Sequence, residues 1–460
     1  MGQGNMDSAF FSDLLASIAE RGRSVLKLSP WPRDAENRAN SLADMCRALL
    51  SGRGEASGVA LASEINGRYR SLNDDDKGAF FRALAEDFGP DRARVESAVA
   101  RWTATSGEAA AAEIHYASEP RRQELFRRLN RAPGGTAALV AMRADLIEAM
   151  RADRGLAVLD RDFVHLLGSW FNRGFLVLRR IDWSSPAAVL EKIIRYEAVH
   201  EIRDWDDLRR RIDSVDRRCY AFFHPALVDE PLIFVEVALT LAPPAAIAPL
   251  LAERRAHVAQ DKARAAAFYS ISNCQQGLSG VSFGNFLIKQ VVEEIRRELP
   301  RIETFVTLSP VPGFRAWVES CDDSAVEPFV RTVRDIALDG QWAEKSEAVT
   351  RMRKALEPLA AHYFLKARRS DGRVVDSVAR FHLGNGARLE RINPMGDLSE
   401  KGLAESYGVM VNYQYDLAEI ERNHEAFANQ GAVAASSAVK KLLPSAKARP
   451  LAAALPAPSE

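Results

Sequence analysis

Apolar residues recur at three- and four-residue spacing along the first third of the chain, which is the stripe of an amphipathic helix. Breaks rich in Gly, Pro and Asp separate the stripes, and no β-rich run interrupts them. We therefore expect residues 1–178 to form an all-helical N-terminal domain, for packing or oligomerisation rather than catalysis, because no metal-spaced histidine pair or phosphate loop occurs there. The stripes comprise Phe10, Phe11, Leu14, Leu15 and Ile18, followed by Asp76–Phe88, Val95–Trp102, Arg121–Leu129 and Gly135–Met150.

The pattern changes after Asp182–Pro186, where short runs rich in Phe, Val, Ile and Leu begin to alternate with helical stretches. Strands mixed with helices predict an α/β or α+β domain, which we expect to span residues 179–430 and to carry the chemistry. The residues after 431 predict a C-terminal helix and a loose tail, since Pro, Ala, Ser and Lys bury little surface. The expected strands are Arg218–His224, Leu232–Leu241, Ala265–Ser272, Thr304–Leu308, Val375–Leu383 and Gly408–Tyr415, with a helix-rich stretch over Ala325–Phe364.

Composition excludes several classes of protein. The 460 residues contain 62 Lys+Arg and 62 Asp+Glu, and a net charge of zero argues against a nucleic-acid or anionic-membrane partner. The four cysteines are too scattered for a disulfide framework or a metal site, and no apolar run reaches the ~18–20 residues that span a bilayer. The N-terminus lacks the basic and apolar regions of a secretory signal, and Asp7 and Asp13 argue against a mitochondrial presequence. We therefore expect a soluble, cytoplasmic protein of a reducing compartment.

One segment, Phe268–Leu299, has the order strand, Gly-rich loop, helix. Gly277, Gly280 and Gly284 would let backbone N–H groups converge at a helix N-terminus, an arrangement that suits a diphosphate, although an ordinary turn is the alternative. Neither the P-loop pattern nor the dinucleotide pattern Gly-x-Gly-x-x-Gly with its acid is present. The run Gln-Gln-Gly-Leu-Ser-Gly instead resembles the coenzyme A diphosphate loop of GNAT acetyltransferases.

Three stretches together resemble the malonyl-CoA decarboxylase family: Phe268–Lys289, Leu308–Phe314 and Ala379–Asn393. The likeness runs from about residue 80 to 420, and includes His165–Trp170, Glu197–His200 and Val409–Tyr415. It implies a helical N-terminal domain followed by a GNAT-like mixed α/β catalytic domain. It also implies conversion of malonyl-CoA to acetyl-CoA and CO2 without a metal or organic cofactor, and a homo-oligomer, often a tetramer.

The resemblance also implies individual site residues. The serine of the family's Leu-Ser-Pro motif falls on Ser309, and the histidine of its Phe-His-Leu motif falls on His382. Members can carry an acidic residue where Ser282 stands. Two further candidates for pocket contacts are His224 and Tyr413, for which a structural role is the commoner one. The family's coenzyme A loop falls on Ser279, Gly280, Val281, Ser282, Phe283, Gly284 and Asn285.

The reaction explains why these residue types are needed. Loss of CO2 from a malonyl thioester leaves an enolate, which requires donors for the oxyanion and an acid for the carbon. The ordinary pKa of histidine, about 6.5, allows proton delivery near neutrality, so His382 is the expected proton donor. Ser309 would hydrogen-bond the substrate carboxylate or its neighbour. A GNAT-type acyltransferase and a non-catalytic coenzyme A-binding regulator are the alternatives, because fold does not decide function.

Overall fold

A computed structural model of the chain describes residues 17, 35–52, 54–281 and 287–444. The chain divides into two compact units. The first comprises residues 1–177, 223–232 and 274–283, and the second comprises 178–222, 233–273 and 284–460. The first unit thus includes two short segments from beyond residue 178.

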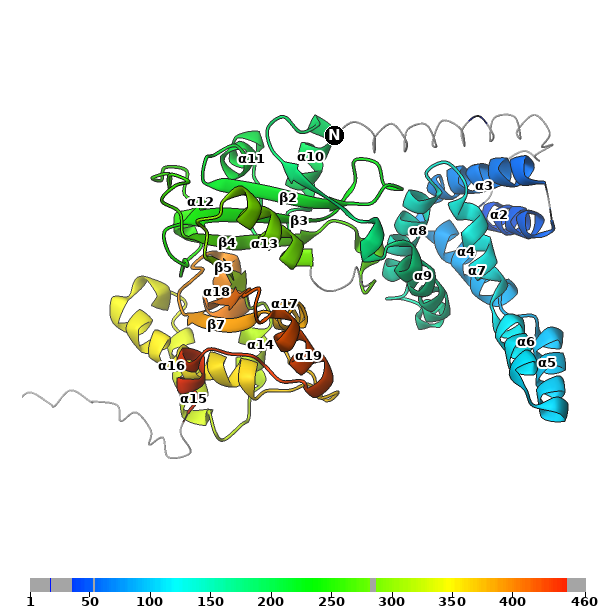
Figure 1. Cartoon of the computed structure of the whole chain (residues 1–460). Coiled ribbons are helices and arrows are strands. Elements are labelled where there is room, and N and C mark those ends of the chain that lie inside the picture. The colour runs from blue at the N-terminus through cyan, green and yellow to red at the C-terminus, as the bar shows by residue number, and fades with distance from the viewer. Residues whose placement is uncertain (1–16, 18–34, 53, 282–286, 445–460) are drawn as a thin grey trace, which may run out of the picture. The chain divides into compact units, whose positions relative to one another are not determined.

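The first unit is helical, as its stripes predict (Figure 1). Its core is aromatic: the rings of Phe126 and Phe163 stack at 4.2 Å between centroids, beside a buried ion pair in which Arg122 Nε lies 2.5 Å from Asp162 Oδ2. Its helices are α2 (Ala35–Leu50), α3 (Glu55–Arg70), α4 (Asp74–Asp87), α5 (Arg92–Thr105), α6 (Glu108–Ser118), α7 (Arg121–Asn130), α8 (Gly135–Ala149), η1 (Arg154–Leu156), α9 (Ala157–Trp170), η2 (Arg173–Phe175) and η3 (Gln276–Leu278).

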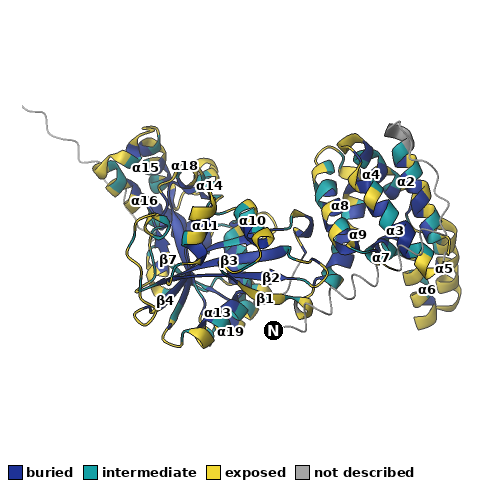
Figure 2. Cartoon of the chain, turned by 90° about the horizontal axis from the view of Figure 1, so that it is seen from above, coloured by how far each residue is buried: buried dark blue, intermediate teal, exposed yellow. Residues whose placement is uncertain are grey.

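The second unit is built on one eight-stranded sheet with the order β1-β2-β3-β4-β5-β8-β6, and β7 pairs with β8. The central strands are buried along their length, as Figure 2 shows in dark blue. The strands are β1 (Val177–Ile181), β2 (Arg217–Phe223), β3 (Pro231–Thr240), β4 (Ala265–Asn273), β5 (Thr304–Thr307), β6 (Ser309–Pro310), β7 (Arg388–Asn393) and β8 (Met410–Gln414).

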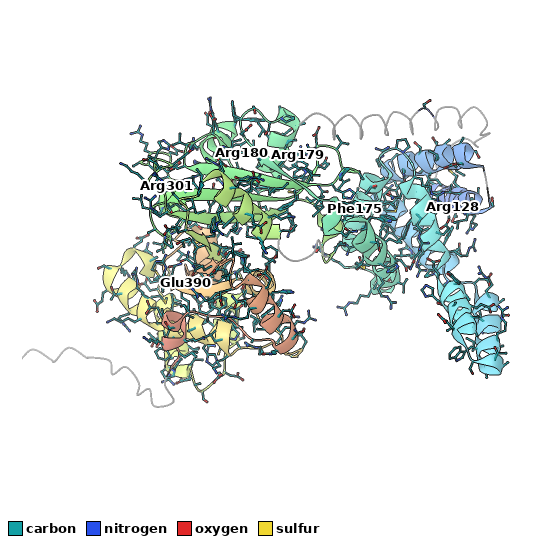
Figure 3. The ribbon with its side chains drawn as sticks, viewed as in Figure 1. Arg128, Phe175, Arg179, Arg180, Arg301 and Glu390 are labelled. Atoms are coloured by element: carbon teal, nitrogen blue, oxygen red, sulfur yellow. The ribbon has the colours of Figure 1, made fainter. Side chains whose placement is uncertain are left out.

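Helices cover both faces of this sheet. Arg211 of α11 reaches Glu236 of β3, whereas Glu298 at the end of α13 pairs with Arg218 of β2 and with Arg180 of β1, which Figure 3 labels. The helices of this unit are α10 (Ala187–Tyr196), α11 (Trp205–Ile212), α12 (Ala248–Leu251), α13 (Leu287–Glu298), α14 (Phe314–Ser320), α15 (Glu327–Ala337), η4 (Trp342–Glu344), α16 (Ser346–Leu365), α17 (Ser377–Gly384), α18 (Glu400–Ser406), α19 (Ile420–Gln430) and α20 (Ser437–Lys441).

The separation of β4 from β5 is the feature that positions the site. These parallel strands pair from Ala265 with Thr304 as far as Phe268 with Thr307. Beyond that point β4 continues with β3, whereas Ser309 pairs with Val411 of β8. The two strands therefore part, and a cavity is lined from both sides of the gap.

The predicted fold class, helices first and a mixed α/β domain after, is confirmed. One predicted element is wrong: Val375–Leu383 is not a strand, because Ser377–Gly384 forms the helix α17. Its short apolar run fits a strand and a helix equally well, and the N-cap hydrogen bond of Asp376 stabilises the helix. The stripe at Phe10–Ile18 and the tail after 444 lie outside the described residues. In the described part of the chain, no helix is both long and apolar enough to cross a membrane.

Candidate active site

Ser309 is placed by a short strand that proline ends. Pro310 has no N–H to extend the ladder, so β6 contains only Ser309 and Pro310. The strand is held by its pairing with β8 and by Asn412, whose Nδ2 donates to the carbonyl of Thr307 at 2.7 Å. Ser309 is 5% exposed, so its hydroxyl faces the interior and is fixed by its neighbours.

His382 lies near the end of the eight-residue helix α17 and is 2% exposed. The helix begins at the cap of Asp376, whose side chain accepts from the backbone N–H of Ala379. After the helix, Gly386 adopts a φ of +81°, and a Cβ there would lie 2.2 Å from the carbonyl oxygen of Ile420, so only glycine fits. Both ends of the helix are therefore fixed, and with them the position of the imidazole.

Four side chains form a continuous hydrogen-bonded chain. The Ser309 hydroxyl donates to Thr307 Oγ1 at 2.8 Å, and Ser309 Oγ lies 3.1 Å from His382 Nε2. On the other side of the ring, His382 Nδ1 lies 2.8 Å from the Tyr415 hydroxyl. The structure thus brings Ser309 and His382 together, as their motifs predict.

Burial determines which atoms carry protons in this series of hydrogen-bonded side chains. Complete burial lowers the pKa of His382 to about 3, so the ring is neutral. Burial also raises the pKa of Tyr415 well above its ordinary value, so that hydroxyl keeps its proton. Because Ser309 gives its only proton to Thr307, Nε2–H must donate to Ser309 Oγ and Nδ1 must accept from Tyr415. The pKa of His382 in the structure thus lies below the ordinary value of about 6.5 expected from the sequence, and its role as proton donor stays a prediction.

Tyr413 packs on the imidazole rather than binding it. Its ring stacks on His382 with centroids 4.6 Å apart, and the residue is fully buried. Its hydroxyl is a buried polar atom without a hydrogen-bond partner among the described residues. It does not line the cavity; its ring contacts the site through His382, and its backbone N–H donates to Thr307 Oγ1 at 3.1 Å.

Ser309 and His382 open into one cavity of about 280 Å³. Most of its walls are apolar, and its described lining contains no lysine or arginine. Within the described ranges, no group of three or more His, Cys, Asp or Glu side chains could hold a metal ion. The lining residues are Val199, Phe268, Tyr269, Ile271, Asn273, Leu308, Ser309, Pro310, Ser377, Val378, Phe381 and His382.

The wall at Val199 is anchored to β4 by a carboxylate. Glu197 accepts from the hydroxyls of Ser270 and Ser272 and from the backbone N–H groups of Val199 and His200. A half-buried carboxylate that receives this many hydrogen bonds holds its loop in one conformation. The Glu197–His200 stretch therefore has a structural task at the edge of the cavity.

The glycine loop is described only in part. Gly277 does not contribute to an open cradle: a Cβ there would lie 1.8 Å from the carbonyl oxygen of Val140, and Arg143 Nη1 donates to the carbonyl of Gly277 at 2.8 Å. It is a glycine required by close packing against α8. Gly280, with a φ of +74°, has open space where its Cβ would be, beside Ser279 and Val281. The other predicted loop residues, Ser282, Phe283, Gly284 and Asn285, lie outside the described residues.

His224 lies in the first unit, in a turn after β2. Its Nδ1 accepts from the N–H of Ala226, and its Nε2 therefore donates to the carbonyl of Trp170, each at 3.1 Å. Its ring packs on Phe171 with centroids 4.6 Å apart. Both ring nitrogens are used by the backbone, which favours the structural role over a pocket contact.

Sequence reasoning missed Tyr415 and Thr307, the outer members of the hydrogen-bonded chain. A signal for Tyr415 exists in the alternation of β8, because residues two apart on a strand share a face. Tyr413 and Tyr415 accordingly both reach His382. Thr307, the last residue of β5, likewise lies two residues before Ser309, the first residue of β6.

Comparison with known proteins gives matches along nearly the whole chain. Residues 88–171 match the malonyl-CoA decarboxylase N-terminal domain, and residues 174–453 match the malonyl-CoA decarboxylase C-terminal domain. "Malonyl-CoA decarboxylase, mitochondrial" of Anser anser anser is 38% identical over 412 residues, which is 81% of this chain and 81% of that protein. The Rattus norvegicus protein of the same name is 36% identical, over 78% of this chain and 80% of its own.

Solved structures agree with these matches. The crystal structure of malonyl-CoA decarboxylase from Rhodopseudomonas palustris is 56% identical, covers 88% of this chain and 99% of its own, and superposes with a TM-score of 0.85. That from Agrobacterium vitis is 52% identical, covers 87% and 99%, and has a TM-score of 0.83. Similarity of this extent covers both the helical region and the domain that holds the cavity.

Proposed function

The chain belongs to the malonyl-CoA decarboxylase family, and from this premise we propose that Ser309 and His382 assist the conversion of malonyl-CoA to acetyl-CoA and CO2. Decarboxylation of malonyl-CoA is the reaction of its relatives at 36–56% identity over most of the chain, and it is the reaction of this enzyme. The observation that supports the two residues is the 3.1 Å contact of Ser309 Oγ with His382 Nε2 at the wall of one cavity.

The apolar cavity favours the loss of CO2. The substrate carboxylate carries a concentrated charge, whereas the products of carbon–carbon cleavage are neutral CO2 and an enolate whose charge is spread over oxygen and carbon. Walls such as Ile271, Val378 and Phe381 solvate the concentrated charge poorly. When the substrate binds, the Ser309 hydroxyl turns from Thr307 Oγ1 to the substrate, and its hydrogen bond stabilises the enolate oxygen that forms.

His382 supplies the proton. The buried ring is neutral, and a bound carboxylate beside it raises the pKa of the imidazole. His382 therefore gains a proton together with the substrate anion and delivers it from Nε2 to the α-carbon after CO2 leaves. The Tyr415 hydroxyl at Nδ1 keeps the ring oriented. One proton is consumed for each CO2 released, and the ring returns to its neutral form.

The substrate diphosphate is proposed to bind the backbone around Gly280. Its positive φ turns the chain, and the space beside it is open in the described residues. Ser279 and Val281 provide the flanking N–H groups. These residues belong to the first unit.

The test is turnover of malonyl-CoA alone. Purified full-length protein with malonyl-CoA and no other substrate should release one CO2 and one acetyl-CoA per molecule consumed. An acyltransferase would require an added amine acceptor, and a regulator would bind acetyl-CoA without turning over any acyl-CoA. Either of these results would contradict the proposal.

We also propose that the protein is a cytoplasmic homo-oligomer, in keeping with the family's tetramers. Support for assembly comes from exposed apolar side chains on the α5–α6 hairpin, Val99, Trp102 and Tyr116. Sizing at two protein concentrations tests the first statement, and a monomer at both would refute it. Cell fractionation tests the second.

A further inference from the structure

The helix that carries His382 begins at a buried carboxylate. Asp376 is 2% exposed, and its Oδ1 accepts from the backbone N–H of Ala379 at 2.7 Å. Its Oδ2 accepts from the hydroxyl of Tyr363, on α16, at 3.5 Å. Aspartate is a favoured N-cap, but caps are ordinarily solvated, and this one is enclosed by protein.

Helix α17 is short enough for its cap to matter at the site. His382 lies six residues after Asp376, and between them Ser377, Val378 and Phe381 line the cavity. The far end of the helix is held separately, because His424 Nδ1 donates to the carbonyl of Gly384 at 2.7 Å. The N-terminal end is held by the Asp376 cap. The hydrogen bond to Ala379 therefore sets the tilt of the helix and the position of the imidazole relative to Ser309.

The surroundings leave the charge of Asp376 weakly compensated. Arg380 on the same helix is attractive, but its Nη1 donates to the carbonyls of Val374 and Val375 at 2.7 Å. The other titratable groups that face Asp376 are Tyr363 from α16 and Tyr413 from β8. The Tyr413 hydroxyl has no hydrogen-bond partner in the described structure. Burial raises the pKa of Asp376 to about 6, with the Ala379 N–H and Arg380 opposing the shift.

We propose that Asp376 is a positioning residue for the decarboxylation: its ionised cap holds His382 Nε2 against Ser309 Oγ, and its protonation in mild acid loosens that hold and lowers kcat. The inference rests on the role proposed for His382. It adds that the fall of kcat on the acid side of the pH profile comes from the carboxylate of Asp376, which lies six residues before His382 along the chain.

The experiment compares full-length wild type, Asp376→Asn and Asp376→Ala by steady-state decarboxylation of malonyl-CoA from pH 5 to 8.5. Asparagine keeps the shape and an uncharged acceptor, so its kcat at neutral pH should fall about 3- to 10-fold, to the acid-side value of the wild type, and its acid limb should flatten. Alanine removes the cap, and kcat should fall more than about 10-fold at every pH. The KM for malonyl-CoA should change less than about twofold in both, since the cap contributes nothing to coenzyme A binding.

The matched control is Asp204→Ala, which removes the same kind of cap from α11, where Asp204 accepts from the N–H of Asp207 at 2.7 Å. It should leave kcat and the acid limb as in the wild type. An unchanged acid limb in Asp376→Asn would overturn the inference, and this isosteric variant decides the matter even where Asp376→Ala fails to fold. His382→Gln in the same assay separates the two proposals. If it is inactive while Asp376→Asn behaves as wild type, only the positioning role fails; if it turns over normally, both fail.

Discussion

Two histidines of this protein have similar packing and different partners. His382 on α17 and His224 in the turn after β2 each bond both ring nitrogens and pack on an aromatic ring whose centroid is 4.6 Å away. The partners of His224 are a backbone carbonyl and a backbone N–H, each of which can act in one direction only. The partners of His382 are hydroxyls, which both donate and accept.

This difference separates a structural histidine from one that can do chemistry. Backbone partners fix one tautomer of His224 and oppose any gain of a proton at Nδ1. The hydroxyls of Ser309 and Tyr415 can reorient when His382 gains or loses a proton, so the ring can cycle without breaking its hydrogen bonds. Only His382 also lines the cavity. Burial alone does not distinguish the two, because it lowers the pKa of both rings.

Exchanging each histidine for glutamine should show the largest effect. We expect His382→Gln to lower kcat by about 10²-fold or more with coenzyme A affinity nearly unchanged, since only the proton donor is lost. His224→Gln should keep kcat within about threefold and lower the melting temperature instead. Steady-state kinetics, acetyl-CoA titration calorimetry and thermal melting measure these outcomes. Equal losses of kcat in the two variants would end the distinction.

Removing the Ser309 hydroxyl should have the next largest effect. Ser309→Ala leaves His382 Nε2 without its acceptor and the enolate without a donor, so kcat should fall by about 10²-fold at an unchanged Kd for acetyl-CoA. Ser406→Ala is the control, because this buried serine bonds only backbone carbonyls of its own turn. Turnover like that of the wild type in Ser309→Ala would remove the hydroxyl from the mechanism.

The hydroxyl on the other side of the ring should contribute less. Tyr415→Phe removes the donor to Nδ1 but leaves the ring packed, so we expect kcat to fall about 10-fold. Tyr220→Phe is the matched control. Tyr220 on β2 is also buried, and its hydroxyl donates to Glu298 on α13. A loss of the same size in both variants would mean that the effect is one of general packing.

The smallest effect concerns stability in acid. Burial lowers the pKa of His382 to about 3, whereas the unfolded chain titrates near 6.5. The unfolded state therefore binds a proton first, and stability is lost as the pH falls below about 6.5. Between pH 7 and 5 the wild type should lose ~2 kcal/mol more than His382→Gln. Denaturant unfolding at the two pH values measures the difference, and equal losses would show that the ring is not held neutral.

Local patterns in the sequence are enough to predict much of the catalytic domain. Apolar runs identified β3, β4 and β5 to within two residues at each end, because fully buried strands need continuous apolar side chains. The Leu-Ser-Pro and Phe-His-Leu motifs identified the Ser309–His382 pair through the family, and the structure places the two side chains in contact. Motif residues are recognisable in this way because a reaction limits which side chains can stand at a position.

What only the folded chain could show depends on contacts between distant segments. The sequence pattern predicts a strand over Val375–Leu383 where the structure has the helix α17, since the few apolar residues fit either period and the N-cap Asp376 is not one of them. Gly277 was assigned to a phosphate cradle, but its nearest neighbour is the backbone of Val140, far away in the sequence. The depressed pKa of His382 likewise follows from burial by residues of several elements. Sequence specifies which groups are available, whereas packing sets their distance, solvation and protonation, because these are properties of neighbours that the chain brings together only on folding.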